Sequence, residues 1–445
     1  MFEDMTQEQA REEILKQVAE YCDKFHNQEK EYVPGDRINY ASRVYDNKEM
    51  TNLVDAALEF WLTSGHWTDQ FEAALGEYLN VPYVSYVNSG SSANLLAFMA
   101  LTSPLLEERA IKRGDEIITV AAGFPTTVSP YVQYGAVPVF VDVTIPQYNI
   151  DVAQLEKALS PRTKAVMIAH TLGNPFDIAA VKAFCEAHNL WLVEDNCDAL
   201  GSTYTLNGKT QQTGTFGDIG TSSFYPPHHM TTGEGGAVYT RNPLLHKIIR
   251  SMRDWGRDCA CPSGHDNCCG HRWDGQYGEL PQGYDHKYVY SHFGYNLKAT
   301  DLQASIGCAQ IEKFPSFVQA RKRNFARMDA ALQDVADKLI LPKPVEGGDP
   351  SWFGYCISVP QGQSAAKITQ ALEEAGVQTR RLFAGNIIKH PCFDQMRKSG
   401  EGFRVVGSLA NTDAIMERTF WLGVYPGMTD AKLDYMAQSI HKALG

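Results

Sequence analysis

Short apolar runs alternate with helix-like segments through the central part of the chain. The runs are rich in Val, Ile and Ala and have few polar breaks, which is typical of parallel strands buried on both faces. They occupy residues 116–120, 137–143, 165–169 and 190–195, and helical spacing appears at 152–159 and 178–188. The pattern predicts an α/β layered domain whose chemistry lies in the loops at the strand ends.

The two ends of the chain follow a different pattern. Near the N-terminus, apolar residues recur at helical spacing (Ile14, Leu15, Val18, Tyr21, Cys22 and Phe25), so we expect an amphipathic helix that packs on the body or on a partner subunit. Two further helices are expected at 301–314 and 321–339, before a smaller C-terminal α/β domain. We therefore expect an N-terminal extension at 1–31, a large domain at 32–315 with a cysteine-rich insert near 255–290, and a small domain at 316–445.

Composition narrows the class of protein. The chain has 445 residues, 44% hydrophobic and 21% charged, with a formal net charge of -12. This acidic balance, without any basic run of five residues, argues against a nucleic-acid surface. Neither a secretion signal nor an apolar stretch long enough to span a bilayer is apparent, so we expect a cytoplasmic protein without a membrane partner.

Ten cysteines in such a chain point to a reducing compartment, where thiols are free, catalytic or bound to metal. Four of them gather in an irregular segment rich in Gly, His, Asp, Trp and Tyr: Cys259, Cys261, Cys268 and Cys269. Four thiolates can hold zinc or a [2Fe–2S] cluster, and spacing alone leaves both open.

Three features at strand ends are candidates for binding a phosphorylated cofactor. The run from Asn88 to Leu95, which includes Gly90 and Ser91, follows a strand and opens a helix, where backbone amides can meet a phosphate. Phe124 lies just beyond a strand, where an aromatic ring can stack on a planar ligand. Asp195 ends another strand, where a carboxylate can hold a ring nitrogen protonated. Each has a simpler reading taken alone: a helix cap, a core aromatic and a surface ion pair.

The segment from Ser223 to Gly236, SFYPPHHMTTGEGG, links these features. It resembles the lysine segment of the sugar-nucleotide aminotransferases, the DegT/DnrJ/EryC1/StrS family of fold type I pyridoxal-phosphate enzymes, and the resemblance extends from about Tyr32 to the C-terminus. It implies an aspartate aminotransferase-like fold with a mostly parallel seven-stranded sheet. By this resemblance Gly90, Ser91 and Ser223 hold the cofactor phosphate, Phe124 stacks on its ring and Asp195 pairs with its nitrogen.

The same resemblance implies a homodimer. Asn296, in the run Gly294-Tyr295-Asn296-Leu297-Lys298, corresponds to a residue that reaches the phosphate bound by the neighbouring subunit. Each active site would then be shared by two chains.

The chain departs from this family at one position. His228 stands where the family has the lysine that forms a Schiff base with the cofactor, and His229 follows it. An imidazole moves protons but forms no such bond, so we expect pyridoxamine 5'-phosphate, held non-covalently, with His228 as the base. The expected reaction is dehydration rather than amino transfer. A catalytically inactive relative, or a sensor of sugar nucleotides, is the alternative.

Cysteine spacing points to one subgroup of these histidine-containing enzymes. Cys197, Cys259, Cys261 and Cys269 resemble the [2Fe–2S] ligands of iron–sulfur 3-dehydrases from deoxysugar and lipopolysaccharide pathways, although the interval from Cys197 to Cys259 is a few residues longer. The resemblance implies a CDP-4-keto-6-deoxyhexose substrate and a flavin- and iron–sulfur-containing NAD(P)H-dependent reductase as partner. A cluster-independent dehydratase of the same fold, with zinc or nothing on the thiols, is the second reading.

Overall fold

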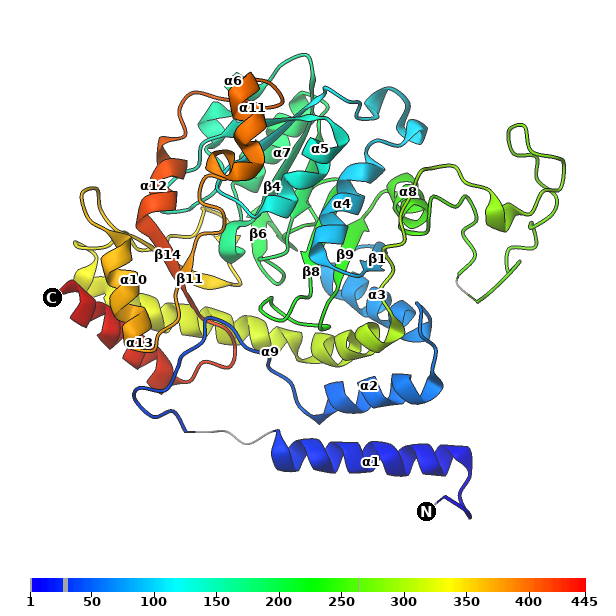
Figure 1. Cartoon of the computed structure of the whole chain (residues 1–445), viewed down its shortest axis with the longest axis horizontal. Coiled ribbons are helices and arrows are strands. Elements are labelled where there is room, and N and C mark those ends of the chain that lie inside the picture. The colour runs from blue at the N-terminus through cyan, green and yellow to red at the C-terminus, as the bar shows by residue number, and fades with distance from the viewer. Residues whose placement is uncertain (1, 27–30, 263) are drawn as a thin grey trace.

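A central eight-stranded sheet organises the chain (Figure 1). The computed structural model describes residues 2–26, 31–262 and 264–445. The strand order is β1-β9-β8-β5-β4-β2-β3-β13, and only β9 runs antiparallel to its neighbours among the paired strands of this sheet in the described ranges. The strands are β1 (Tyr83–Val87), β2 (Glu116–Val120), β3 (Val137–Val141), β4 (Thr163–Ala169), β5 (Trp191–Asp195), β8 (Ile219–Ser223), β9 (Gly236–Thr240) and β13 (Arg404–Val405).

The predicted fold class is confirmed, with one addition. Seven strands form the expected mostly parallel sheet, and the two-residue β13, from the C-terminal part of the chain, adds an eighth at its edge beside β3. Strands β2 and β5 are buried at every residue, as expected of parallel strands covered on both faces.

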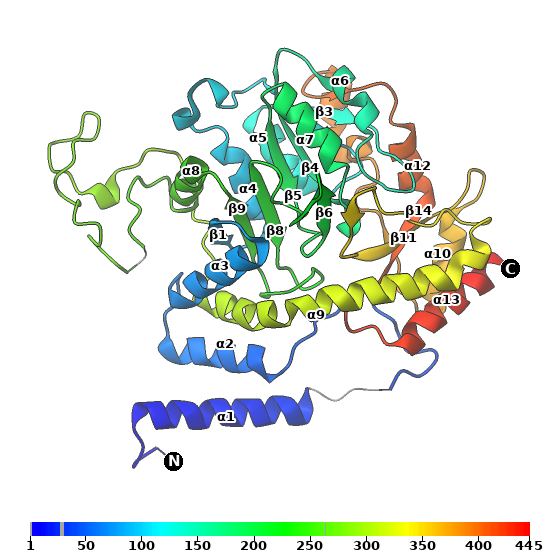
Figure 2. The same ribbon diagram turned by 180° about the vertical axis from the view of Figure 1, so that it is seen from behind.

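Helices cover both faces of the sheet (Figure 2). One hydrophobic core includes residues of α4 (Gly90–Ala100), α5 (Ser129–Tyr134) and α8 (Pro243–Arg253), and a second includes α6 (Leu155–Ala158) and α7 (Ile178–Ala187). The segment expected to be helical at 152–159 is one 3-10 turn followed by the four residues of α6. Two small sheets complete the β structure: β10-β6-β7, with β6 (Thr203–Leu206), β7 (Lys209–Gln212) and β10 (Gly348–Asp349), and β11-β14-β12, with β11 (Gly354–Ser358), β12 (Arg380–Arg381) and β14 (Thr419–Gly423).

The C-terminal part has a hydrophobic core of its own. Sheet β11-β14-β12 shares this core with α10 (Ala365–Glu374), α13 (Asp430–Leu444) and the second half of α9 (Asp301–Leu332). The remaining helices there are α11 (Asp394–Ser399) and α12 (Ala410–Arg418).

The expectation of two separate helices at 301–314 and 321–339 is wrong. Helix α9 runs unbroken from Asp301 to Leu332 and contains Pro315. A proline removes one backbone donor and favours a break, but Phe314, Phe317 and Val318 on either side are buried in one hydrophobic cluster with α3 (His66–Leu79). Tertiary packing therefore overrides the local signal.

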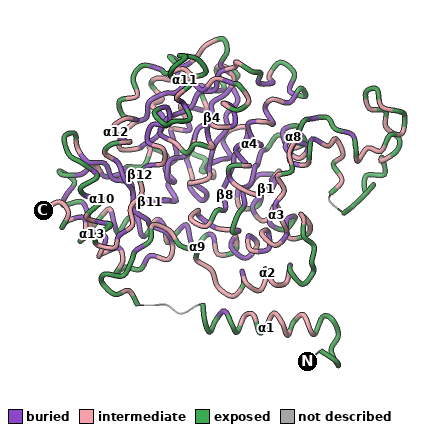
Figure 3. Tube along the Cα trace, in the orientation of Figure 1, coloured by how far each residue is buried: buried purple, intermediate pink, exposed green. Residues whose placement is uncertain are grey.

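The N-terminal helix α1 (Gln7–Phe25) lies along α2 (Asn47–Glu59), outside the main body (Figure 1). Arg11 pairs with Asp55 and with Glu59, and Cys22 is the buried residue of α1. The rest of α1 is intermediate or exposed, as the colours of Figure 3 show. The expected extension at 1–31 includes residues 1 and 27–30, which lie outside the described part of the chain. None of the described helices is long and apolar enough to cross a membrane.

The cysteine-rich insert extends away from the sheet as an irregular arm (Figures 1 and 2). Ion pairs connect segments of the arm that are distant in sequence. Arg272 binds Asp285 with two hydrogen bonds of 2.7 and 2.6 Å, and His286 bonds to Asp258 at 2.8 Å. The described part of this arm is thus held by charged pairs rather than by an apolar core.

Candidate functional site

Asp195 occupies the centre of the site at the carboxyl end of β5. It is 4% exposed. Its Oδ2 accepts hydrogen bonds from the Asn94 amide at 2.8 Å and the Thr127 hydroxyl at 2.7 Å, and its Oδ1 accepts one from the Cys197 backbone at 3.1 Å. A buried carboxylate with three donors is held in one orientation. Such a group can bind a protonated ring nitrogen.

The N-terminus of α4 meets the end of β8 beside this carboxylate. Ser89 caps the helix by accepting a hydrogen bond from the Ser92 backbone at 3.0 Å, and Gly90 and Ser91 form the first turn. A Cβ on Gly90 would lie 2.4 Å from the Cβ of Ser223, so only glycine allows the two segments to approach this closely. The structure therefore brings together the three residues predicted to hold a phosphate, at a helix end that favours anions.

His228 lies in the connection between β8 and β9. Its side chain is 16% exposed, its ring centroid is 5.4 Å from that of Phe353, and its Nδ1 is 3.5 Å from Asp198 Oδ1. Burial lowers the pKa of His228 to about 4, so its imidazole is neutral at pH 7. Burial and the nearby Asp195 raise the pKa of Asp198 to about 8. A neutral imidazole is the form that can accept a proton.

His229 is engaged elsewhere. It is 2% exposed, and its Nε2 donates to the Ser351 carbonyl at 2.7 Å. That bond fixes the proton on Nε2 and ties the ring to the C-terminal part of the chain. This arrangement favours a structural role for His229.

Arg321 of α9 is a buried residue that sequence reasoning missed. One guanidinium nitrogen donates to the His228 carbonyl at 3.1 Å, and another donates to the carbonyls of Trp352 at 3.3 Å and Phe353 at 3.4 Å. Nothing in the local sequence of α9 marks it. Asn94 and Thr127 could have been identified more easily from the sequence, because Asn94 lies in the Ser/Gly run and Thr127 lies three residues after Phe124.

Phe124 and Asn296 lie at the surface. Phe124 is 52% exposed, contacts Phe383 edge-on, and precedes the turn that supplies Thr127 to Asp195. Asn296 is exposed, and its side chain accepts a hydrogen bond from Lys298 at 2.8 Å. Their roles in stacking on a ring and in reaching a partner subunit stay predictions.

The cysteines predicted as iron ligands fall in two places. On the insert, the sulfur atoms of Cys261 and Cys269 are 3.5 Å apart. Although slight burial opposes it, hydrogen bonds from the Cys269 backbone and the thiols of Cys268, Cys269 and Cys259 lower the pKa of Cys261 to about 6. Cys197 lies instead beside Asp195, where burial and that carboxylate raise its pKa.

Within the described ranges, no group of three or more Cys, His, Asp or Glu side chains is placed to hold a metal ion. The ligand set Cys197, Cys259, Cys261 and Cys269 stays a prediction.

Comparison with known proteins identifies the scaffold. The sequence profile of the DegT/DnrJ/EryC1/StrS aminotransferase family matches residues 44–441. The chain belongs to this family. The family is named for aminotransferases, yet both aminotransferases and 3-dehydratases are among the relatives of this chain, so the DegT/DnrJ/EryC1/StrS scaffold does not by itself distinguish amino transfer from dehydration.

Two relatives narrow the choice. The chain is 52% identical over 444 residues, 99% of each chain, to the lipopolysaccharide biosynthesis protein RfbH of Salmonella typhimurium. It is 46% identical, over 97% of this chain and 91% of the relative, to dTDP-4-dehydro-2,6-dideoxy-D-glucose 3-dehydratase of Saccharopolyspora spinosa. A sugar 3-dehydratase is thus among its close relatives in the DegT/DnrJ/EryC1/StrS family.

Solved structures agree on the fold. GDP-4-keto-6-deoxy-D-mannose-3-dehydratase of E. coli with bound hydrated PLP superposes with a TM-score of 0.79 at 27% identity, covering 91% of this chain and 100% of that one. The predicted assignment to a fold type I pyridoxal-phosphate scaffold is confirmed.

Proposed function

We propose that this protein is a pyridoxamine-phosphate-dependent 3-dehydratase of a nucleotide-linked 4-keto-6-deoxyhexose in deoxysugar biosynthesis. The observation that carries the proposal is a neutral, nearly buried imidazole, His228, in the place of the family's lysine. The close dehydratase relative supports the same reaction class. Following the sequence resemblance, we take the CDP-linked sugar as substrate, which makes the chain a CDP-6-deoxy-L-threo-D-glycero-4-hexulose 3-dehydrase.

The residues present fit pyridoxamine 5'-phosphate. Gly90 keeps the first turn of α4 against Ser223, where an added Cβ would clash, and Asp195 offers a buried, pre-oriented carboxylate. When bound, this cofactor supplies an amine that condenses with a ketone and a ring that accepts electrons. Gly90, Ser91 and Ser223 would hold its phosphate and Phe124 would cover its ring.

The chain's own residues would manage the protons. Asp195, fixed by Asn94 and Thr127, would hold a proton on the ring nitrogen. His228 would accept a proton from the aminomethyl carbon of the bound cofactor, and the hydroxyl at sugar carbon 3 would leave with the electron pair of its C–O bond. Neither histidine can form the Schiff base with the cofactor that lysine forms in the aminotransferases. Elimination is therefore favoured over amino transfer. General base catalysis of this kind contributes about 10²- to 10⁴-fold.

We further propose that Cys197, Cys259, Cys261 and Cys269 hold a [2Fe–2S] cluster. Such a cluster would pass single electrons from a flavin- and iron–sulfur-containing NAD(P)H-dependent reductase, so that the product becomes a 3-deoxy sugar. The 3.5 Å approach of two of these thiols supports the proposal, whereas the separate place of Cys197 beside Asp195 does not. Iron and acid-labile sulfide analysis, with two of each per chain expected, separates this reading from a cluster-independent dehydratase with zinc or no metal.

A homodimer completes the proposal. Asn296 is exposed on this chain and has no contact with Asp195 or His228 among the described hydrogen bonds. The nearby Phe293 is fully exposed, and Trp255 and Tyr290 are about half exposed. Aromatic side chains gathered on one face are typical of an interface.

The reaction class is tested without the reductase. Chain loaded with pyridoxamine phosphate is incubated with CDP-4-keto-6-deoxyglucose labelled with ¹⁸O at carbon 3, and label released to water is followed by mass spectrometry. We expect release by the wild type and a loss of at least about 100-fold in His228→Asn. The control His26→Asn changes an exposed histidine at the C-terminal end of α1 and should release label normally.

Two results would contradict the proposal. Formation of a 4-amino sugar from glutamate would indicate an aminotransferase. Retained cofactor and sugar-nucleotide binding without any release of label would indicate a sensor.

A further inference from the structure

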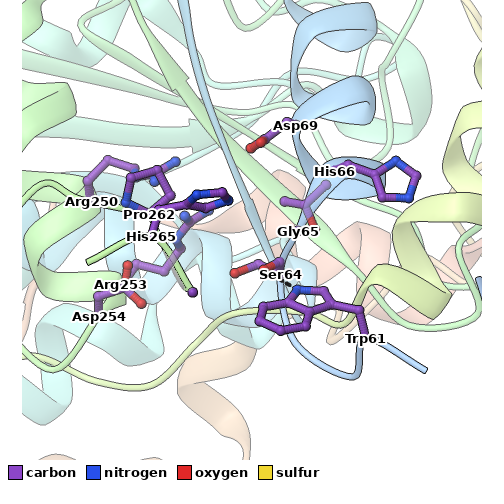
Figure 4. A pocket seen from close by; sticks show the side chains of 12 residues that line it. Trp61, Ser64, Gly65, His66, Asp69, Arg250, Arg253, Asp254, Pro262 and His265 are labelled. Carbon is purple, nitrogen blue, oxygen red and sulfur yellow. Dashed lines mark hydrogen bonds between the residues drawn. The ribbon is translucent and has the colours of Figure 1, made fainter. Parts of the chain in front are cut away.

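A cavity of about 410 Å³ lies between the body of the protein and the insert (Figure 4). Its walls come from the segment before α3 and the first turn of α3, from the end of α8 and from the insert residues Pro262 and His265. Its volume is in the range of small-molecule sites. The reaction proposed above uses none of its residues.

Two arginines make one wall of the cavity electropositive. Arg250 and Arg253 are three residues apart on α8 and therefore lie on the same face. Both bind one carboxylate, Glu72, at 3.3 and 2.8 Å. Repulsion from Arg253, followed by burial, lowers the pKa of Arg250, although the nearby carboxylates of Glu72, Asp254 and Asp69 act in the opposite direction.

Arg253 has spare hydrogen-bonding capacity. It is 2% exposed and donates to the Tyr86 carbonyl at 2.8 Å, but its Nε is buried without a partner among the described residues. Two carboxyl groups also line the cavity. Asp254 is paired with Lys298 at 2.5 Å, and burial together with Glu72 raises the pKa of Asp69. The cavity wall thus carries charges of both signs, and the arginine pair is the part of it that could attract an anion.

The opposite wall is a flat aromatic surface. Trp61 is 41% exposed, and its indole nitrogen donates to the Ser64 carbonyl at 3.0 Å, which fixes the ring beside the cavity (Figure 4). A Cβ on Gly264 of the insert would lie 2.8 Å from the same ring, so the insert is packed directly against it. An indole held in this way can stack on a nucleotide base.

We infer that this cavity binds a nucleoside diphosphate, with the diphosphate on Arg250 and Arg253 and the base against Trp61. The inference rests on the proposed function, because it assigns the nucleotide end of that substrate. Asp254, in the cavity wall, forms a backbone bridge with Asn296, and Lys298 bonds both side chains. The cavity thus adjoins the face assigned to the partner subunit, and the nucleotide held here would present its sugar to the partner's active site.

The test measures binding rather than turnover. Full-length chain loaded with pyridoxamine phosphate is dialysed to equilibrium against radiolabelled CDP. We expect Arg250→Met to weaken CDP binding about 10- to 100-fold, since it removes a charge-assisted contact. Trp61→Leu should weaken binding about 10-fold, and Trp61→Phe should restore most of it. The control Arg323→Met alters an exposed arginine paired with Asp430 and should bind CDP like the wild type.

Competition identifies which part of the ligand each wall reads. Inorganic pyrophosphate should displace CDP from the wild type but not from Arg250→Met. Displacement of CDP by cytidine should instead depend on Trp61 alone. Wild-type affinity for CDP in Arg250→Met, in a protein that unfolds at the same urea concentration, would overturn the inference. So would the absence of binding of CDP, GDP, UDP and dTDP at millimolar concentration. Arginine-dependent CDP binding without sugar dehydration would support the inference and count against the proposed function.

Discussion

Replacing Gly90 by alanine should destabilise the protein, although helix propensity predicts the reverse. Alanine is favoured over glycine inside a helix by up to about 1 kcal/mol. At Gly90, however, the added Cβ would lie 2.4 Å from the Cβ and 2.7 Å from the hydroxyl of Ser223. Because both atoms belong to the buried end of β8, they cannot move aside as a flexible side chain would. Overpacking of this kind costs about 1–3 kcal/mol.

The clash should also weaken cofactor binding, since α4 and β8 must separate where the phosphate is proposed to bind. A cost of that size corresponds to roughly a 5- to 150-fold loss of affinity for pyridoxamine phosphate. Urea unfolding gives the first quantity and equilibrium dialysis of the cofactor gives the second. Gly123→Ala is the matched control, because its Cβ would meet nothing closer than 3.9 Å although it lies next to Phe124.

A second substitution identifies the clash as the cause. In Gly90→Ala/Ser223→Gly the opposing Cβ is absent, so the double variant should recover part of the stability lost in Gly90→Ala, and the two changes should be non-additive. If Gly90→Ala is as stable as the wild type and binds the cofactor equally well, the close approach of α4 to β8 is not a feature of the folded protein.

Three further changes test other parts of the structure. Glu194→Ala should cost about 3–5 kcal/mol in urea unfolding, because it leaves His170 and three backbone donors buried without their shared carboxylate; a cost below 1 kcal/mol would contradict this. Burial opposes ionisation of Glu116, but hydrogen bonds from Arg404 lower its pKa overall. Its contribution to the free energy of unfolding is therefore present above about pH 4.5 and is lost as the pH falls through the folded-state pKa. Wild type and Glu116→Gln should converge in stability in acid, as measured by urea unfolding at each pH. Arg272→Lys should lose the two hydrogen bonds to Asp285 and speed proteolytic cleavage within the insert. An unchanged cleavage rate would mean that this ion pair does not hold the insert in its folded conformation.

The large sheet could be predicted because the sequence signal for each of its strands is local. Each of the four apolar runs carries its own signal for a buried strand, and parallel pairing follows from the helices between them. Gly90 and Asp195 became candidates for a similar reason, since one follows and the other ends a strand-like run, whereas Ser223 became a candidate only through the family resemblance; the roles of all three in binding the cofactor stay predictions. The contacts of Asp195 with Asn94 and Thr127 join positions about 70 to 100 residues apart, and no local pattern reports such a pairing.

The least predictable feature bears directly on the candidate base. The sequence pattern predicted separate helices at 301–314 and 321–339, which places Arg321 at the start of the second helix, in the small domain. In the structure the helix is continuous, so Arg321 is carried by the same rigid element that packs on α3 and β11. From there it bonds the carbonyl of His228 and the carbonyls of Trp352 and Phe353. The position of the imidazole therefore depends on a helix that spans the large and C-terminal cores, and a proline that broke α9 would displace His228 without touching it.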